Sequence, residues 1–178
     1  MKKFIFLLMM ILIAAIFITS CAAGGSNKEG DSGEDTIFSE DLKNIVEKIY
    51  QGVEVELPTV ENKEINEDNV EYYLGLSSMT GIKQGLASDA VLSTIPYYMC
   101  FLRVPDINNI EKIKSDIKNN IDLTKWICDR AEYVYINNCE DVIFLAVGKE
   151  NIVQALNDSF KELASGNEGK LIYKNVDD

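Results

Sequence analysis

Cys21 is the residue whose position most clearly indicates chemistry. It follows an uninterrupted apolar stretch at residues 4–18, which lies behind two lysines, and the small residue Ser20 directly precedes it. This is the pattern of a bacterial lipoprotein signal, in which the cysteine thiol takes a diacylglyceryl group and the preceding peptide is cut off. The apolar stretch is shorter than the roughly 20 residues of a spanning helix, which favours cleavage. We therefore predict a lipid anchor on Cys21, with an ordinary secretory signal as the alternative.

The chain contains no histidine, which excludes several kinds of catalytic site. Without imidazole there is no Ser-His-Asp or Cys-His catalysis, and the commonest metal ligand is missing. The cysteines show no C-x-x-C spacing, and no glycine-rich phosphate loop is present. We predict no catalytic residue, no metal and no cofactor. The 29 acidic side chains leave one enzymatic alternative, a hydrolase of cell-wall glycans that uses a carboxylate pair.

Three further cysteines, Cys100, Cys128 and Cys139, form an odd count that argues against a complete disulfide framework, and Cys128 and Cys139 are not expected to pair. Cys128 and Cys139 flank a predicted strand whose seven residues span about 23 Å, whereas bridged Cα atoms lie about 4.4–6.8 Å apart. Cys100 lies in an apolar run and is predicted to be buried. Cys139 lies in a polar turn and is predicted to be the exposed thiol, with a pKa that its acidic neighbours raise.

Four side chains are candidates for ligand binding: Trp126, Lys125, Arg103 and Tyr72. Trp126 is the only tryptophan, and Lys125 and Arg103 are among the few cations of an acidic chain. The alternatives are that Trp126 fills the core and that the two cations neutralise nearby carboxylates. In the pairs at 72–73 and 97–98 we expect one tyrosine ring to face the core, which leaves Tyr72 as a surface that could stack on a sugar.

The charge balance restricts the partners. The 17 basic and 29 acidic side chains give −12, which becomes −14 once the two lysines of the signal are removed. Such a charge argues against nucleic acid, which needs a basic surface, and against adhesion to anionic lipid. The simplest interpretation is a solvated acidic surface; the alternative is a cationic ligand or basic partner.

The chain divides into three parts. Residues 1–20 form the predicted signal, and residues 21–36, rich in glycine, serine and charge, form a predicted tether with no large apolar residue. Residues 37–178 have the size and apolar content of one domain with its own core.

The apolar pattern of this domain predicts an α+β fold. A helical lead-in begins at the N-cap Ser39, and from Gly81 the order is β-β-α-β-β-α. The predicted elements are strands 82–87 and 97–104, a helix after Asp106 with isoleucines from Ile107 to Ile121, strands 131–137 and 142–148, and a helix over 152–163. We expect a four-stranded, mainly antiparallel sheet with both helices on one face.

Four segments carry a resemblance to a known family. They are Asp41-Leu42-Lys43-Asn44-Ile45-Val46, Glu71-Tyr72-Tyr73-Leu74-Gly75, Phe101-Leu102-Arg103-Val104 and Lys125-Trp126-Ile127-Cys128. In this order behind a lipoprotein signal, they resemble the clostridial-type lipoproteins classified as domain of unknown function 4358. The resemblance implies a small Gram-positive lipoprotein on the outer face of the cell membrane, with no assigned activity. We expect a non-enzymatic module that binds an envelope protein or glycan.

Overall fold

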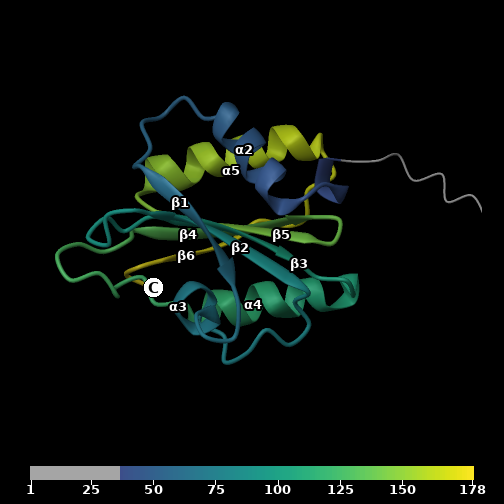
Figure 1. Ribbon diagram of the computed structural model, residues 1–178, viewed down its shortest axis with the longest axis horizontal. Helices are drawn as coiled ribbons and strands as arrows, with labels where there is room; N and C mark the ends of the chain where they lie inside the picture. Colours follow the sequence, from purple (N-terminus) through teal and green to yellow (C-terminus); the bar gives the residue numbers. More distant parts are fainter. Residues whose placement is uncertain (1–36) are drawn as a thin grey trace, which may run out of the picture. The chain divides into compact units, whose positions relative to one another are not determined.

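The structure is a computed structural model, and it describes residues 37–178. These residues form one antiparallel sheet of six strands in the spatial order β1-β2-β3-β5-β4-β6 (Figure 1). The strands are β1 Val60–Ile65, β2 Gln84–Ala90, β3 Tyr98–Arg103, β4 Tyr133–Cys139, β5 Val142–Gly148 and β6 Ile172–Asn175. The helices are α2 Leu42–Gln51, α3 Val70–Leu74, α4 Ile110–Asn120 and α5 Glu150–Ala164, with 3-10 turns η2 Ile37–Ser39 and η3 Ile107–Asn109. The predicted α+β class and the helical lead-in are confirmed.

The helices cover both faces of the sheet, so the expected placement of two helices on one face is wrong. Figure 1 shows α2 and α5 on one side and α3 and α4 on the other. The central strands explain this arrangement. Successive residues of a strand point to opposite faces, and in β3 Cys100 packs in the core under α4 while Phe101 packs in the core under α5. Because β3 and β5 are apolar on both faces, each face has to be covered.

Two of the six strands were not predicted, because neither has an apolar pattern. β1 is mostly charged and amide residues and pairs with β2 along its full length, from Val60 opposite Ala90 to Ile65 opposite Gly85. β6 has four residues and pairs with β4. Backbone hydrogen bonding adds both edge strands without needing a buried side-chain face.

A buried lysine fixes the segment that leads into β6. Lys114 of α4 is fully buried, and its Nζ donates hydrogen bonds to Glu111 Oε1 at 2.7 Å, Asn138 Oδ1 at 2.8 Å and the Lys170 carbonyl at 2.7 Å. Gly169 lies so close to Asn138 that a Cβ there would be 2.1 Å from its Oδ1. Lys114 therefore links α4 to β4 and to the segment after α5, and this segment is also held against β4 by the Gly169 backbone N–H, which donates to the Asn138 carbonyl at 2.7 Å.

The predicted helix starts need two corrections. Asp41, not Ser39, caps α2, since its carboxylate accepts from the Lys43 backbone N–H at 2.8 Å. Asp106 does cap a helical turn, but this turn is η3, and α4 begins at Ile110. Ile107 consequently lies outside the apolar stripe of α4 and is 64% exposed.

One end of the sheet brings several connections together. Here β2 and β5 end while β3 and β4 begin, as the aligned row Asp89, Tyr98, Val147 and Val134 shows. The loop at residues 121–132, the α4–β4 loop, lies at this end, and it is the green loop at the left of Figure 1. Within residues 37–178, no helix has the length and apolar character needed to cross a membrane.

Candidate functional site

The α4–β4 loop connects two clusters of different chemistry. Its first half contributes Lys125 and Trp126 to a group of aromatic rings, the aromatic cluster, completed by Tyr72, Tyr73 and Tyr98. Its second half contributes Asp129, Arg130 and Glu132 to a concave site beside β6, the Lys149 groove. Three of the four predicted binding residues thus lie in the aromatic cluster, and the groove was not predicted.

Tyr98 lies at the centre of the aromatic cluster and is fully buried. Trp126 stacks on it with ring centroids 6.0 Å apart and an angle of 29° between the rings. Tyr73 meets Tyr98 edge to face at 5.4 Å, and Tyr72 lies 6.5 Å away. Since Trp126 is 7% exposed and belongs to the core under α4, it fills the core as the alternative interpretation proposed.

Lys125 places its ammonium among these rings. Its Nζ lies 3.7 Å from the ring centroid of Tyr72, 4.3 Å from that of Tyr98 and 5.0 Å from that of Trp126. It also donates to the Tyr72 carbonyl and, at 3.2 Å, to the Tyr98 hydroxyl. Among residues 37–178 no carboxylate forms a direct ion pair with Lys125, but the charges of Asp89 and Asp122 favour its protonated form from a distance. Burial lowers the pKa of Lys125 to about 8.

A chain of hydrogen bonds leads from the aromatic cluster to the edge of the sheet. The Tyr98 hydroxyl donates to the Tyr73 carbonyl at 2.9 Å, and the Tyr73 hydroxyl donates to Asp89 Oδ2 at 2.9 Å. Lys63 of β1 completes the chain with an ion pair to Asp89 at 3.1 Å. Burial and the Asp89 charge both raise the pKa of Tyr73 far above its ordinary value. The buried hydroxyls of Tyr98 and Tyr73 are therefore both hydrogen-bonded within the protein.

Only the pair at 72–73 matches the prediction that one tyrosine ring of each pair faces the core and the other faces outward. Tyr73 is buried and Tyr72 is 45% exposed, as expected for neighbours on a surface helix. Tyr97 and Tyr98 are both buried, because the sheet is covered on both faces. Tyr72 therefore presents part of a ring to solvent while its other side contacts Lys125.

Arg103 lies away from both clusters, at the opposite end of β3. Its guanidinium donates to both carboxylate oxygens of Asp141, at 2.8 and 3.1 Å, and to the carbonyls of Phe38 and Glu40 at 2.9 and 2.8 Å. These bonds tie the lead-in to the β4–β5 turn. Arg103 thus neutralises a carboxylate, as the alternative interpretation expected.

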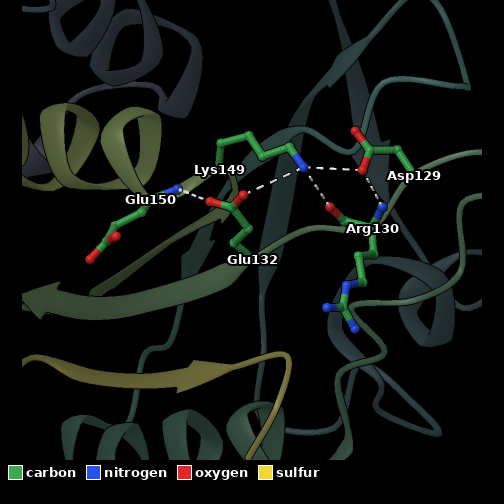
Figure 2. Close-up of polar contacts among 5 residues, drawn as sticks. All are labelled: Asp129, Arg130, Glu132, Lys149 and Glu150. Carbon is green, nitrogen blue, oxygen red and sulfur yellow. Dashed lines mark hydrogen bonds and ion pairs between the residues drawn. The ribbon is translucent and has the colours of Figure 1, made fainter.

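The Lys149 groove is built around one ammonium group (Figure 2). Lys149 Nζ lies 3.0 Å from Asp129 Oδ1, 3.3 Å from the Arg130 carbonyl and 3.6 Å from Glu132 Oε1. The other oxygen of Glu132 accepts from the Glu150 backbone N–H at 3.0 Å. That N–H belongs to the first residue of α5, where unpaired N–H groups and the helix dipole favour an anion. Glu132 therefore fastens the start of β4 to the start of α5.

Charged and aromatic side chains form the walls of this groove, whose volume is about 450 Å³. The lining residues beyond those of Figure 2 are Tyr133, Asn175, Val176 and Asp177. Arg130 reaches across to Asp177 at 3.4 Å, so the residues after β6 form one side of the groove. Hydrogen bonding from the Arg130 backbone N–H and from Lys149 lowers the pKa of Asp129. Asp129 is therefore held as an ionised acceptor.

The sequence carried only a weak signal for this groove. A cluster of charges directly precedes β4, and Lys149 and Glu150 stand where β5 gives way to α5. Such junctions are common, and only the pairing of β4 with β5 and β6 places these residues beside Asn175 and Asp177. No spacing of residues in the sequence predicts that these side chains lie beside Asn175 and Asp177.

The three cysteines of residues 37–178 are unpaired, which confirms that Cys128 and Cys139 do not bridge, but the predicted exposure of Cys139 is wrong. Cys100 is buried as expected, whereas Cys139 is only 2% exposed and Cys128 is the exposed thiol. Burial first, and then the charges of Glu140 and Glu168, raise the pKa of Cys139 to about 11. Cys139 is the last residue of β4 and faces the core under α5, so its polar neighbours do not expose it.

The groove offers acceptors and donors for a polar ligand, and no cofactor can be assigned from its residues. In the part of the chain from 37 to 178, no group of three or more cysteine, aspartate or glutamate side chains is placed to hold a metal ion. No protein-family model, curated protein or solved structure matches this chain. Cys21 and the predicted signal and tether lie outside the described residues.

Proposed function

We propose that this protein is a non-enzymatic binding module, anchored by lipid on Cys21 to the outer face of the cell membrane, and that the Lys149 groove holds its ligand. The anchor rests on the sequence pattern before Cys21. The observation that carries the binding role is the groove itself, a concave site of about 450 Å³. The groove brings hydrogen-bond donors and acceptors together with the aromatic ring of Tyr133, and such convergent polar groups can orient a polar ligand.

The contacts inside the groove favour binding over the hydrolase alternative. A glycan hydrolase needs one carboxyl group that holds a proton for the leaving group, together with a second, free carboxylate. Here one lysine contacts both Asp129 and Glu132, and the pKa of Asp129 is lowered, so Asp129 is unsuited to donate a proton. Arranged in this way, the charged groups orient a ligand.

The anchor is tested by metabolic labelling. Cells that express the full chain should incorporate labelled palmitate into it, and Cys21→Ala should abolish the label while the unprocessed chain accumulates. Unlabelled wild-type protein, or equal labelling of Cys21→Ala, would contradict the lipid anchor.

The groove is tested through the exposed thiol beside it. A photo-crosslinker attached to Cys128, next to Asp129, should capture the same envelope component in repeated experiments on intact cells. Lys149→Met removes the central ammonium and should strongly reduce this capture. Lys112→Met is the matched control, because Lys112 forms an exposed ion pair with Asp116 on α4 and should leave capture unchanged. Equal capture by both variants would overturn the assignment of the groove.

A further inference from the structure

Four side chains at the edge of the sheet form a single patch. The register places Tyr133 opposite Asn175 and Tyr135 opposite Tyr173. Because every second residue of a strand points to the same face, these four side chains share one face of β4 and β6. This face is the one that α5 covers nearer the centre of the sheet, since Tyr133 and Tyr135 pack against the core beneath α5. We call the three tyrosines the tyrosine platform.

The tyrosine platform is held at its base and open at its outer edge. Ring centroids are 6.0 Å apart for Tyr133 and Tyr135, 6.0 Å for Tyr135 and Tyr173, and 6.5 Å for Tyr133 and Tyr173. Tyr173 lies on the edge strand β6 and is 53% exposed, whereas the other two rings are partly buried. Rings that already pack on one another lose little conformational freedom when a ligand stacks on them.

The tyrosine platform is continuous with the Lys149 groove, because Tyr133 and Asn175 also line the groove. A ligand that crosses this boundary therefore meets aromatic rings on one side and amide, guanidinium and carboxylate groups on the other. A pyranose ring has the matching surfaces. Its C–H groups carry partial positive charge and stack on the negative face of an aromatic ring, and its hydroxyls both donate and accept hydrogen bonds.

The charge of the groove restricts which sugars fit. It is lined by four carboxylates and two cations: Asp129, Glu132, Glu150 and Asp177 against Arg130 and Lys149. This excess of negative charge disfavours an anionic glycan and equally a second copy of this acidic chain. Uncharged and amine-bearing sugars avoid the repulsion.

We propose that the tyrosine platform and the adjoining groove bind a glycan of uncharged or amine-bearing sugars, with a pyranose ring stacked on Tyr173. This proposal rests on the proposed function, because the groove supplies the polar half of the site. It adds the chemical class of the ligand and the residue that recognises it.

The test uses the full chain, purified in detergent, and three oligosaccharides of equal length. The probes are oligomers of N-acetylglucosamine, of glucosamine and of a uronic acid, and binding is measured by calorimetry at neutral pH. The first two should bind, with the amine-bearing oligomer tighter, and the anionic oligomer should not. Failure of all three to bind, or preference for the uronic acid, would overturn the proposal.

Substitutions of Tyr173 locate the binding surface. Tyr173→Ala should weaken binding by roughly tenfold, the scale of one aromatic stacking contact, while Tyr173→Phe keeps the ring and should bind within about threefold of wild type. Leu92→Ala is the matched control, because Leu92 is a 63% exposed apolar residue on the β2–β3 connection and should change nothing. Equal binding by Tyr173→Ala and wild type would place the glycan elsewhere and overturn the proposal.

The two proposals fail in different ways. If no oligosaccharide binds but the crosslinker on Cys128 captures a protein that Lys149→Met no longer captures, the glycan class is wrong and the groove keeps its binding role. If oligosaccharide binding and specific capture are both absent, both proposals are wrong.

Discussion

Lys125 belongs to the α4–β4 loop, and Lys149 contacts the same loop at Asp129 and Arg130; the two lysines illustrate two ways in which a fold accommodates an ammonium group. Lys125 lies among three aromatic rings with its pKa lowered by burial, whereas Lys149 lies at the surface between two carboxylates. Around the Lys125 ammonium, aromatic ring faces and a backbone carbonyl replace water. Around the Lys149 ammonium, carboxylates and solvent together stabilise the charge. The difference separates a buried, closely packed region from a charged region at the surface.

The remaining polar groups of each region show the same contrast. Around Lys125, the Tyr98 and Tyr73 hydroxyls bond to protein acceptors, and the aromatic rings pack closely. Around Lys149, the surrounding side chains line a hollow. Substitutions should therefore affect mainly stability in the aromatic cluster and mainly binding in the groove.

The largest expected effect is the loss of stability when the aromatic cluster is truncated. Trp126→Ala removes a buried ring that stacks on Tyr98, and it should lower the free energy of unfolding by about 3–5 kcal/mol. Tyr173→Ala removes an exposed ring and should cost less than about 1 kcal/mol. Urea denaturation followed by circular dichroism measures both. If both variants lost a similar free energy of unfolding, the contrast between a structural aromatic cluster and a proposed binding region would be contradicted.

The pH dependence of stability tests the burial of Lys125. Its pKa is about 8 in the folded protein and 10.5 ordinarily, so between these values the unfolded chain binds the extra proton. Stability relative to Lys125→Met should therefore rise as the pH increases from about 8 to 10.5, by on the order of 1–3 kcal/mol in total. Comparing wild type with the variant largely removes the effects of the buried tyrosines. A difference that is constant with pH would show that Lys125 is solvated as Lys149 is.

Removing the other lysine should change ionisation and not folding. Lys149→Met should raise the pKa of Asp129 but leave it below its ordinary 3.8, because the backbone hydrogen bond from Arg130 persists. Carbon NMR of the carboxylate follows this titration. The midpoint of thermal unfolding should move by less than about 2 °C, since exposed ion pairs contribute little to stability. Lys112→Met serves as the control that leaves Asp129 unaffected, and a large loss of stability in Lys149→Met would contradict this interpretation.

The smallest perturbation is the labelling of Cys128, which lies on the α4–β4 loop between the two regions. A maleimide should modify Cys128 in the native protein, whereas Cys100 and Cys139 should react only after unfolding because they are buried. Peptide mapping by mass spectrometry identifies the modified residues. Native labelling of Cys139 would show that the end of β4 opens readily, in conflict with its pairing to β5.

Some of these features followed from local patterns in the sequence. The isoleucine stripe at 110–117, the aromatic run that became β3 and the hairpin of β4 and β5 all appear as periodicity within a few residues. Trp126, Lys125 and Tyr72 were candidates for ligand binding because of their residue types, and Lys125 contacts the rings of both Tyr72 and Trp126. Trp126 is buried in the core and Tyr72 is 45% exposed, and a binding role for these residues stays a prediction.

Other features had no local signal. β1 is too polar and β6 too short to stand out, so the sheet was expected to have four strands and one covered face. Cys139 was expected at the surface because its neighbours in the chain are polar, yet its side chain points into the core. Lys149 and Tyr173 looked ordinary because their partners are far away in the sequence.

The sequence by itself determined the α+β class, the positions of the main helices and central strands, the prediction of a lipid anchor at Cys21 and the acidic charge. These properties depend on residue type and on spacing over a few positions. Only the tertiary structure decided that helices cover both faces, that Lys125 is enclosed by aromatic rings and that the groove adjoins three tyrosines. Each of these depends on strand order and register, which join residues distant in the chain through backbone hydrogen bonds that carry no side-chain signature.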